Sequence, residues 1–260
     1  MKKKTLQEHS KNYREEVNYY VEFSKAEDYP KKIDKFLLQK IKGKIVLDLG
    51  CGGGRYLKTL SSLSKKYYGL DISIQQLEII KEKAKKINNV EFFNCSAENI
   101  PLPDKSIDVV VATWVISTVN SFKRKTKILS EMNRVLKNNG KVYLVENDSK
   151  EEFEIIRGHI KRTEHYNNWL IKKGFKIVRN IKTHFKFSSF QTGKLVINKI
   201  WGKRVSNQVK SEIINHRVII FEKGKEALTR ANQFPHGSPG SIPGLGVPSS
   251  VNLQRKARDV

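Results

Sequence analysis

Ile45 to Tyr56 reads Ile-Val-Leu-Asp-Leu-Gly-Cys-Gly-Gly-Gly-Arg-Tyr, and this stretch decides the fold. An apolar run containing Asp48 passes into four glycines within five residues, and a helical pattern follows. A strand therefore meets a tight turn that opens a helix. Glycine accepts positive φ and lets backbone N–H groups approach a bound molecule. We expect a ligand on this turn. The alternative, an ordinary strand-to-helix turn, seldom needs so many glycines.

Four more strands follow the glycine turn, separated by helical patterns. The β-branched run at Ile107–Thr113 is typical of a central parallel strand that is buried on both faces. Strands that alternate with helices predict an α/β fold with a parallel sheet. The expected strands are Tyr67–Ile72, Val90–Asn94, Ile107–Thr113 and Lys141–Glu146, and the expected helices are Arg55–Ser64, Ile74–Lys86 and Ser121–Leu136.

Ligands of such sheets bind beyond the carboxyl ends of the strands. The glycine turn, Asp71, residues 96–99 and residues 112–115 would converge there. Asp71 lies 21 positions beyond Gly50, and an acid about that far along a β-α-β unit can accept hydrogen bonds from both hydroxyls of a ribose. Alternatively, Asp71 caps the helix that starts near Ser73. The glycine turn upstream favours the ribose role.

The turn does not match the dinucleotide fingerprint Gly-x-Gly-x-x-Gly, which requires a glycine where Arg55 stands. The order Asp48-x-Gly50-x-Gly52-x-Gly54 instead resembles the first motif of class I S-adenosylmethionine (SAM) dependent methyltransferases of type 11. The resemblance covers about residues 30 to 148. Its other motifs are Gly69-Leu70-Asp71-Ile72-Ser73, Ala97-Glu98-Asn99-Ile100-Pro101, Ser106-Ile107-Asp108-Val109-Val110, and Glu131-Met132-Asn133-Arg134-Val135-Leu136 before Gly140.

This resemblance implies a Rossmann-like seven-stranded α/β sheet with helices on both faces and an antiparallel last strand. It also implies SAM as the methyl donor, with the glycine turn around its methionine portion and Asp71 on its ribose. Ile72 and the backbone around Ala97 would contact the adenine. Carbonyls near Ala112 and Thr113 would face the SAM ammonium. The implied cofactor residues are Asp48, Gly50, Cys51, Gly52, Gly54, Asp71, Ile72, Ser96, Ala97, Glu98, Ala112 and Thr113.

The sequence departs from the family pattern at two places. Ser96 stands where the family usually has an acid, so a contact to the adenine amino group would have to come from Glu98 or Asn99. Many relatives carry a histidine after the fourth strand, but Ser117 and Thr118 stand there. We therefore assign no catalytic residue, since in-line methyl transfer can rest largely on alignment of donor and acceptor.

His165 and Tyr166, after the fifth strand, are candidate substrate contacts or simply polar positions on a surface helix. Residues 1–43 are expected to form an N-terminal helical lid, in two helices that break at Tyr29-Pro30. The aromatic side chains along one face of the first helix either cover a cofactor or form part of the hydrophobic core. Gly43 is expected to end the second helix.

Residues 44–225 are expected to form the methyltransferase domain, and the part after the fifth strand should choose the substrate. Within it, residues 190–213 would be an inserted helical element that is rich in basic residues. The other expected elements are a helix at Glu151–Lys173 and strands at Phe175–Ser188 and Asn215–Glu222. The expected apolar face of the insert is Leu195, Val196, Ile200, Trp201 and Val205.

Charge indicates an anionic partner. The chain has a formal net charge of +24, from 50 Lys and Arg against 26 Asp and Glu. Between Lys172 and Lys210 there are eleven Lys or Arg residues and no Asp or Glu. Lys203 and Arg204 could grip a phosphate of a polyanion while Trp201 stacks on a base. A solvated face on a Lys-rich protein is the alternative, because such composition also follows from genome bias or from a thermophilic source.

Only two cysteines occur, Cys51 and Cys95, so the sequence predicts neither a disulfide framework nor a Cys/His metal site, and a reducing, cytoplasmic setting fits best. The longest apolar run, Ile107–Val119, falls short of the roughly 18 residues that a membrane span needs. The N-terminus lacks the apolar segment of a signal peptide.

Residues 226–260, rich in Pro, Gly and Ser, are expected to be a disordered or non-native tail.

Two functions remain open. The first is a SAM-dependent methyltransferase whose acceptor is a small metabolite or an RNA such as tRNA. A loose similarity of Gly54-Arg55-Tyr56-Leu57 and of the N-terminal helices to wobble-uridine tRNA methyltransferases supports the tRNA option. The second is a non-catalytic protein of the same fold that binds RNA or a partner enzyme. The oligomeric state does not follow from the sequence.

Overall fold

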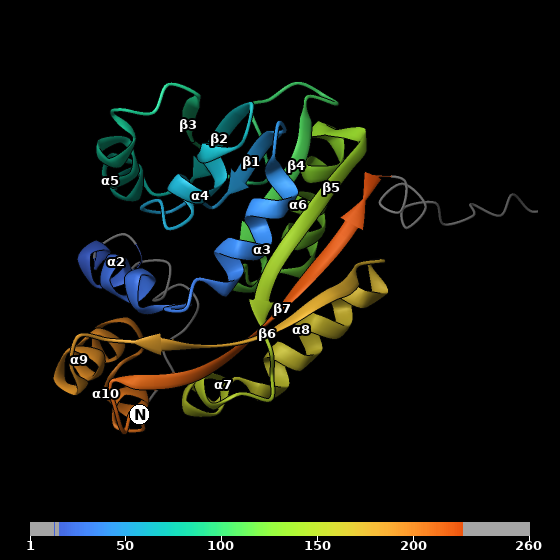
Figure 1. Cartoon of the computed structure of the whole chain (residues 1–260). Coiled ribbons are helices and arrows are strands. Elements are labelled where there is room, and N and C mark those ends of the chain that lie inside the picture. Colours follow the sequence, from blue (N-terminus) through green and yellow to red (C-terminus); the bar gives the residue numbers. More distant parts are fainter. Residues whose placement is uncertain (1–12, 14–15, 226–260) are drawn as a thin grey trace, which may run out of the picture.

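The computed structural model describes residue 13 and residues 16–225 (Figure 1). Its strands are β1 (Ile45–Leu49), β2 (Lys66–Asp71), β3 (Val90–Asn94), β4 (Ile107–Thr113), β5 (Leu136–Asn147), β6 (Lys176–Lys186) and β7 (Ile213–Gly224). Its helices are α2 (Val17–Ala26), α3 (Lys32–Ile41), α4 (Leu57–Ser62), α5 (Ile74–Ala84), the short 3₁₀-helix η1 (Ile116–Thr118), α6 (Phe122–Val135), α7 (Glu152–Arg157), α8 (Ile160–Lys172), α9 (Phe190–Trp201) and α10 (Lys203–Ser206).

The strands form one seven-stranded sheet in the order β3-β2-β1-β4-β5-β7-β6. β1 to β5 pair in parallel, whereas β7 runs antiparallel to both β5 and β6. The predicted fold class is therefore confirmed. The strand order reverses between β1 and β4, so their carboxyl ends flank the crevice in which sheets of this kind bind ligands.

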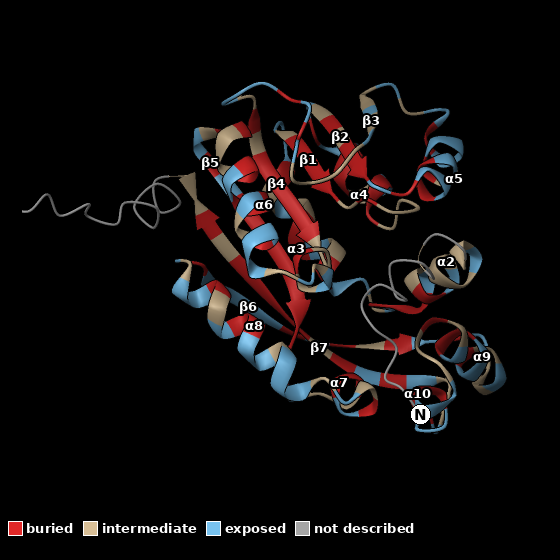
Figure 2. Ribbon diagram, turned by 180° about the vertical axis from the view of Figure 1, so that it is seen from behind, coloured by how far each residue is buried: buried red, intermediate tan, exposed pale blue. Residues whose placement is uncertain are grey.

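Helices cover both faces of the sheet because the central strands β1 and β4 are apolar on both sides. On one face, α6 and α8 contribute Met132 and Leu170 to a core with Leu47 and Val110 of the central strands. On the other face, α3, α4 and α5 pack against residues such as Val46. Figure 2 shows this layering, with buried strands in the middle and the outer face of α8 exposed.

A third apolar cluster lies beyond the ends of the strands. α2 packs beside α9 there (Figure 1), and the cluster joins Phe23 of α2, Phe153 of α7, Phe185 of β6 and Ile197 of α9. The segments in this cluster are far apart in the sequence. Together they form a lobe over one end of the sheet.

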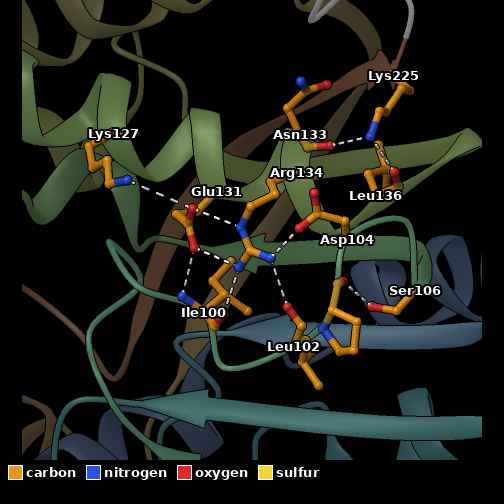
Figure 3. Close-up of polar contacts among 11 residues, drawn as sticks. Ile100, Leu102, Asp104, Ser106, Lys127, Glu131, Asn133, Arg134, Leu136 and Lys225 are labelled. Atoms are coloured by element: carbon orange, nitrogen blue, oxygen red, sulfur yellow. Dashed lines mark hydrogen bonds and ion pairs between the residues drawn. The ribbon is translucent and has the colours of Figure 1, made fainter.

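Arg134, in the motif before Gly140, ties α6 to the loop after β3 (Figure 3). Its guanidinium donates to the carbonyls of Ile100 and Leu102 at 2.7 and 2.9 Å and to Asp104 at 2.8 Å. Glu131 accepts from the Ile100 N–H at 2.9 Å and also pairs with Arg134. These contacts fix the loop that carries residues 96–99.

The helix expected at Glu151–Lys173 is two helices, α7 and α8. Gly158 separates them in the left-handed conformation, with φ of 70°, and its N–H closes the end of α7 on the carbonyls of Glu154 and Ile155. A glycine at this position is a common helix end. The apolar periodicity continues past the break, which explains the wrong prediction.

The insert at residues 190–213 contains α9 and α10, but its apolar face differs from the expected one. Leu195 is 47% exposed, and Ile197 is buried in its place. Trp201 is half-buried. β5 is also longer than expected, because it already begins at Leu136, which pairs with Ile107 of β4.

Within residues 1–43, α3 packs on the sheet through Ile33 and Leu37, while α2 joins the third cluster. The lid at residues 1–43 and the tail at residues 226–260 stay predictions. Residues 1–12, 14–15 and 226–260 lie outside the described residues.

Candidate active site

A cavity of about 750 Å³ lies at the carboxyl ends of β1, β2, β4 and β5. One half of its wall is formed by the glycine turn, Asp71 and the loop after β3, and the other half by α2, α7, α8 and the segment after β4. A volume of this size is typical of small-molecule sites.

The chain changes direction sharply after β1, because Gly50 adopts a φ of 76°. The N–H groups of Gly50 and Cys51 both donate to the carbonyl of Leu70, at 2.7 and 3.0 Å, and so attach the turn to β2. A Cβ on Gly50 would collide with the side chain of Val115. Glycine is therefore required by both conformation and space.

Asp71 is buried at the end of β2, and both of its oxygens accept hydrogen bonds. Oδ1 accepts from the Ser73 N–H at 2.8 Å, and Oδ2 accepts from the Gly52 N–H at 2.9 Å and from the Tyr13 hydroxyl at 3.0 Å. Burial raises the pKa of Asp71, and these donors oppose the shift. The Ser73 hydroxyl, not Asp71, caps α5 by accepting from the Gln76 N–H.

Asp48 lies beneath the turn and is 1% exposed. Its Oδ2 accepts from the Tyr67 hydroxyl at 2.9 Å, while Oδ1 has no hydrogen-bond partner within the described part of the chain. Burial raises the pKa of Asp48 to about 7. A buried acceptor without a hydrogen bond lowers the stability of a protein, so a ligand that donates a hydrogen bond to this oxygen would be favoured.

The loop after β3 supplies Ser96, Ala97 and Glu98 to the wall. Ser96 accepts from the Glu98 N–H at 3.3 Å and so shapes the loop. The Glu98 carboxylate pairs with Arg124 of α6 at 2.5 Å. A contact from Glu98 to an adenine amino group would therefore compete with this ion pair.

Arg55 connects the glycine turn to α2. Its guanidinium forms an ion pair with Glu27 and donates to the Ser24 hydroxyl at 3.0 Å. It also lies 4.8 Å from the centre of the Trp114 ring, in a cation–π contact. Burial raises the pKa of Glu27 to about 7, against the effect of Arg55. Arg55 thus positions α2, which lines the cavity.

Trp114 follows β4 with φ of 54°, a conformation that is uncommon for an aromatic residue. Its Nε1 donates to Oδ1 of Asn147. The same oxygen lies 3.1 Å from Nε2 of His216, and the side-chain amide of Asn147 donates to Glu154. Burial lowers the pKa of His216 to about 3, with Arg157 and Arg55 adding to the shift, so this histidine is neutral. This polar network fixes the end of β5.

Glu146, the residue before Asn147, forms the opposite wall together with α8. Its Oε1 accepts from the Tyr166 hydroxyl at 2.9 Å, and its Oε2 has no hydrogen-bond partner among the residues described. Lys125 lies 4.3 Å from the centre of the Tyr166 ring and donates to the carbonyl of Ile116 at 2.8 Å. The arrangement is a buried carboxyl group beside a phenol, a lysine and a cavity.

Residues 47–144 match the methyltransferase domain family. This segment is therefore similar to class I SAM-dependent methyltransferases. This chain is 32% identical over 133 residues to demethylmenaquinone methyltransferase from Staphylococcus haemolyticus, a match that covers 50% of this chain and 54% of that protein. The chain spans about half the length of the first curated relatives it matches.

Solved structures show the same fold. The YcgJ protein from Bacillus subtilis aligns with a TM-score of 0.53 at 16% identity, covering 73% of this chain and 96% of YcgJ. The [4+2]-cyclase SpnF also aligns with a TM-score of 0.53 at 16% identity, covering 75% of this chain and 81% of SpnF. The fold alone therefore does not specify the reaction.

Most of the predicted cofactor residues of the methyltransferase domain line the cavity, but Gly54 and Ala112 do not. Gly54 faces α5 instead, where a Cβ would lie 2.7 Å from Cγ1 of Ile80. Ala112 is fully buried in the sheet core. The cofactor roles of all the predicted residues stay predictions.

Both candidate substrate contacts after β5 line the cavity, but they differ in burial. His165 is exposed and meets the edge of Phe122, with ring centres 5.4 Å apart. Tyr166 is 4% exposed, so the surface-helix interpretation is wrong for this residue.

Trp201 lines the cavity, yet its ring packs against Phe23 and Phe153, with centres 4.9 and 5.5 Å apart. These contacts occupy the ring, so Trp201 is not available for the expected stacking on a base. Lys203 and Arg204 are exposed, and Arg204 donates to the Arg157 carbonyl at 3.1 Å.

No role was predicted from the sequence for the side chains of Arg55, Trp114 and Glu146. Arg55 counted as a missing glycine and as part of a loose similarity to tRNA methyltransferases. Trp114 counted only as a member of residues 112–115, and Glu146 only as the end of an expected strand. A usable signal was present, because Trp114 follows β4 and Glu146 lies near the carboxyl end of β5, at the sheet edge where ligands bind.

None of the helices in the described ranges has the length and apolar character that a membrane crossing requires. Within the same ranges, no group of three or more His, Cys, Asp or Glu residues could hold a metal ion. The cytoplasmic setting stays a prediction.

Proposed function

We propose that this chain transfers a methyl group from SAM to an acceptor bound in the far half of the cavity. The observation that carries the proposal is the continuity of the cavity, which joins the glycine turn and Asp71 to the wall formed by Trp114, Glu146 and Tyr166. The family match supports SAM as the donor.

The residues present fit SAM. The glycine turn offers an approachable backbone, Asp48 offers an unpaired buried oxygen, and Ile72 is a half-exposed apolar side chain at the rim. Asp71 can accept from ribose hydroxyls once the Tyr13 hydroxyl gives way. When bound, SAM supplies an electrophilic methyl group on a sulfonium. The task of the chain is then to align the acceptor with it.

The acceptor is a small metabolite or an RNA such as tRNA. The aromatic wall of Phe122, Phe153 and Tyr166 supports a small planar acceptor. The exposed lysines between Lys172 and Lys210 support RNA. A non-catalytic protein of the same fold that binds RNA or a partner enzyme is the alternative.

Calorimetric titration with SAM tests the proposal. Wild-type protein should bind SAM, and Asp71→Asn should bind it at least about tenfold more weakly, because hydrogen bonds to a charged group contribute about 1.5–3 kcal/mol each. Glu82→Gln, an exposed acid on α5, should bind like wild type. Equal affinity of Asp71→Asn and wild type would refute the ribose assignment.

Incubation with labelled SAM and a fractionated cell extract then identifies the acceptor. Uptake of label by a small-molecule or RNA fraction supports methyl transfer to that class. Absence of SAM binding would refute the proposal, whereas SAM binding without transfer to any fraction would favour the non-catalytic alternative.

A further inference from the structure

We infer that Glu146 receives the proton that the acceptor loses during methyl transfer, so that the acceptor is methylated on an atom that carries a proton. The inference rests on the proposed function and deepens it. It names both a catalytic residue and the chemical class of the acceptor.

The first observation behind the inference is the position of Glu146. Most predicted cofactor residues lie at the ends of β1 and β2 and in the loop after β3, with Ala112 and Thr113 on β4, whereas Glu146 lies near the end of β5 on the far side of β4. Thr113 pairs with Val145, and Trp114 donates to the Val145 carbonyl at 2.9 Å, so Glu146 stands beside the last residues of β4. An acceptor opposite the donor has to lie against this wall.

The second observation is the burial of the Glu146 carboxyl group and its contacts. Glu146 is 1% exposed, and the nearby cation is Lys125, whose ammonium donates to the Ile116 carbonyl. Oε1 accepts from the Tyr166 hydroxyl, Oε2 has no hydrogen-bond partner in the described part of the chain, and Ser117 lies close to the carboxylate. Burial of a carboxylate is costly, and a proton removes the cost. The group is therefore ready to take up a proton.

The groups around Glu146 adjust its proton affinity. α6 presents Lys125, α8 presents Tyr166 and η1 presents Ser117, while Arg162 of α8 acts on Lys125. Burial raises the pKa of Glu146 to about 7, against the effects of Ser117, Tyr166 and Lys125. Burial lowers the pKa of Lys125 to about 8. A base whose pKa lies near neutral pH is well suited to proton transfer.

Tyr166 is a relay rather than the base. Burial, with the nearby Glu146, raises its pKa well above the usual value, so the phenol stays protonated at neutral pH. It can pass a proton on, because its hydroxyl both donates to Glu146 and can accept from the cavity.

The proton balance defines the acceptor class. As the bond from the acceptor atom to the methyl carbon forms, the carbon–sulfur bond of the donor breaks and its electron pair stays on sulfur. The acceptor proton passes to Glu146, directly or through the Tyr166 hydroxyl, which leaves a neutral thioether and a neutral carboxylic acid. A carboxylate or a tertiary amine loses no proton on methylation, so a base would serve no purpose for it.

Glu146→Gln and Tyr166→Phe test the inference, with Glu164→Gln on the exposed side of α8 as the matched control. Infrared difference spectra of wild type against Glu146→Gln should show a carboxyl C=O band that titrates near pH 7. Signals of Glu27 and Asp48 are common to both proteins and cancel. Absence of this band would refute the inference without any use of SAM.

Transfer of labelled methyl groups to the acceptor fraction gives the second measurement. Wild-type transfer should rise with pH and level off above about 7. Glu146→Gln should lower transfer by at least about 100-fold, as expected for loss of a general base, and should remove the rise while SAM affinity is unchanged. Tyr166→Phe should slow transfer less.

Wild-type transfer and pH dependence in Glu146→Gln would refute the inference, as would an acceptor that is methylated on a carboxylate or tertiary amine. Failure of the proposed function has a different signature. In that case wild-type protein does not bind SAM, or binds it without any transfer.

Discussion

At the residue scale, Gly50 bears the strictest requirement of the site, since it combines a φ of 76° with contact to Val115. We predict that Gly50→Ala lowers the free energy of unfolding by about 1–3 kcal/mol, because left-handed strain adds to displacement of the valine. SAM affinity should fall at least about tenfold, which corresponds to 1.4 kcal/mol. Denaturant titration and calorimetry measure the two effects.

Gly43 provides a matched control, with a φ of 70° and no heavy atom within 4 Å of an added Cβ. Gly43→Ala should lose only the conformational part, about 1–2 kcal/mol, and should bind SAM like wild type. If both variants lose the same stability and keep the same SAM affinity, contact with Val115 does not constrain the turn.

At the element scale, α2 is attached to the glycine turn through Arg55. We predict that Arg55→Ala lowers the free energy of unfolding by about 3–5 kcal/mol, because it leaves Glu27, whose side chain is 3% exposed, buried without its cation. Amide hydrogens of α2 should exchange faster. Arg55→Lys should restore only part of the loss, since one ammonium cannot match the guanidinium fork on Glu27 and Ser24.

Lys25→Ala is the control for this element, because Lys25 and Glu22 form an exposed ion pair on the same helix. Such pairs contribute about 0–1 kcal/mol, so stability and exchange should change little. Unchanged exchange of α2 amides in Arg55→Ala would contradict the role given to Arg55.

At the scale of the whole molecule, the net charge of +24 is the dominant feature. If polyanions bind at the basic residues after α8, affinity for a single-stranded RNA oligomer should fall with salt, with a log–log slope of about −0.7 per phosphate contact. Lys176→Glu with Lys182→Glu, on exposed positions of β6, should reduce both affinity and slope. Fluorescence anisotropy at several salt concentrations measures both.

The same charge change at exposed Lys81 of α5 and at exposed Lys86 just after this helix, Lys81→Glu with Lys86→Glu, is the control. It should leave the slope unchanged if the contact is local to β6. Equal losses in both variants would assign the binding to net charge alone, and a flat salt dependence would contradict phosphate contacts.

How far the sequence predicts the molecule also depends on scale. The parallel sheet was predictable because its strands are short buried runs between helical patterns, and β3 and β4 have the expected bounds. The region after β5 was predicted less well, since apolar periodicity continues across Gly158 and hides the helix break. Contacts such as Arg55 with Glu27 and Tyr13 with Asp71 join separate segments, so no local pattern reveals them.

The contact between Tyr13 and Asp71 has a thermodynamic consequence. A ribose hydroxyl that takes Oδ2 of Asp71 has to replace the tyrosine hydroxyl, which now donates at 3.0 Å. The ligand then exchanges one phenolic donor for an alcoholic donor, and the carboxylate is never desolvated anew. Little enthalpy is gained in such an exchange, so discrimination between nucleosides at this position would come mainly from geometry and from the freedom that Tyr13 recovers.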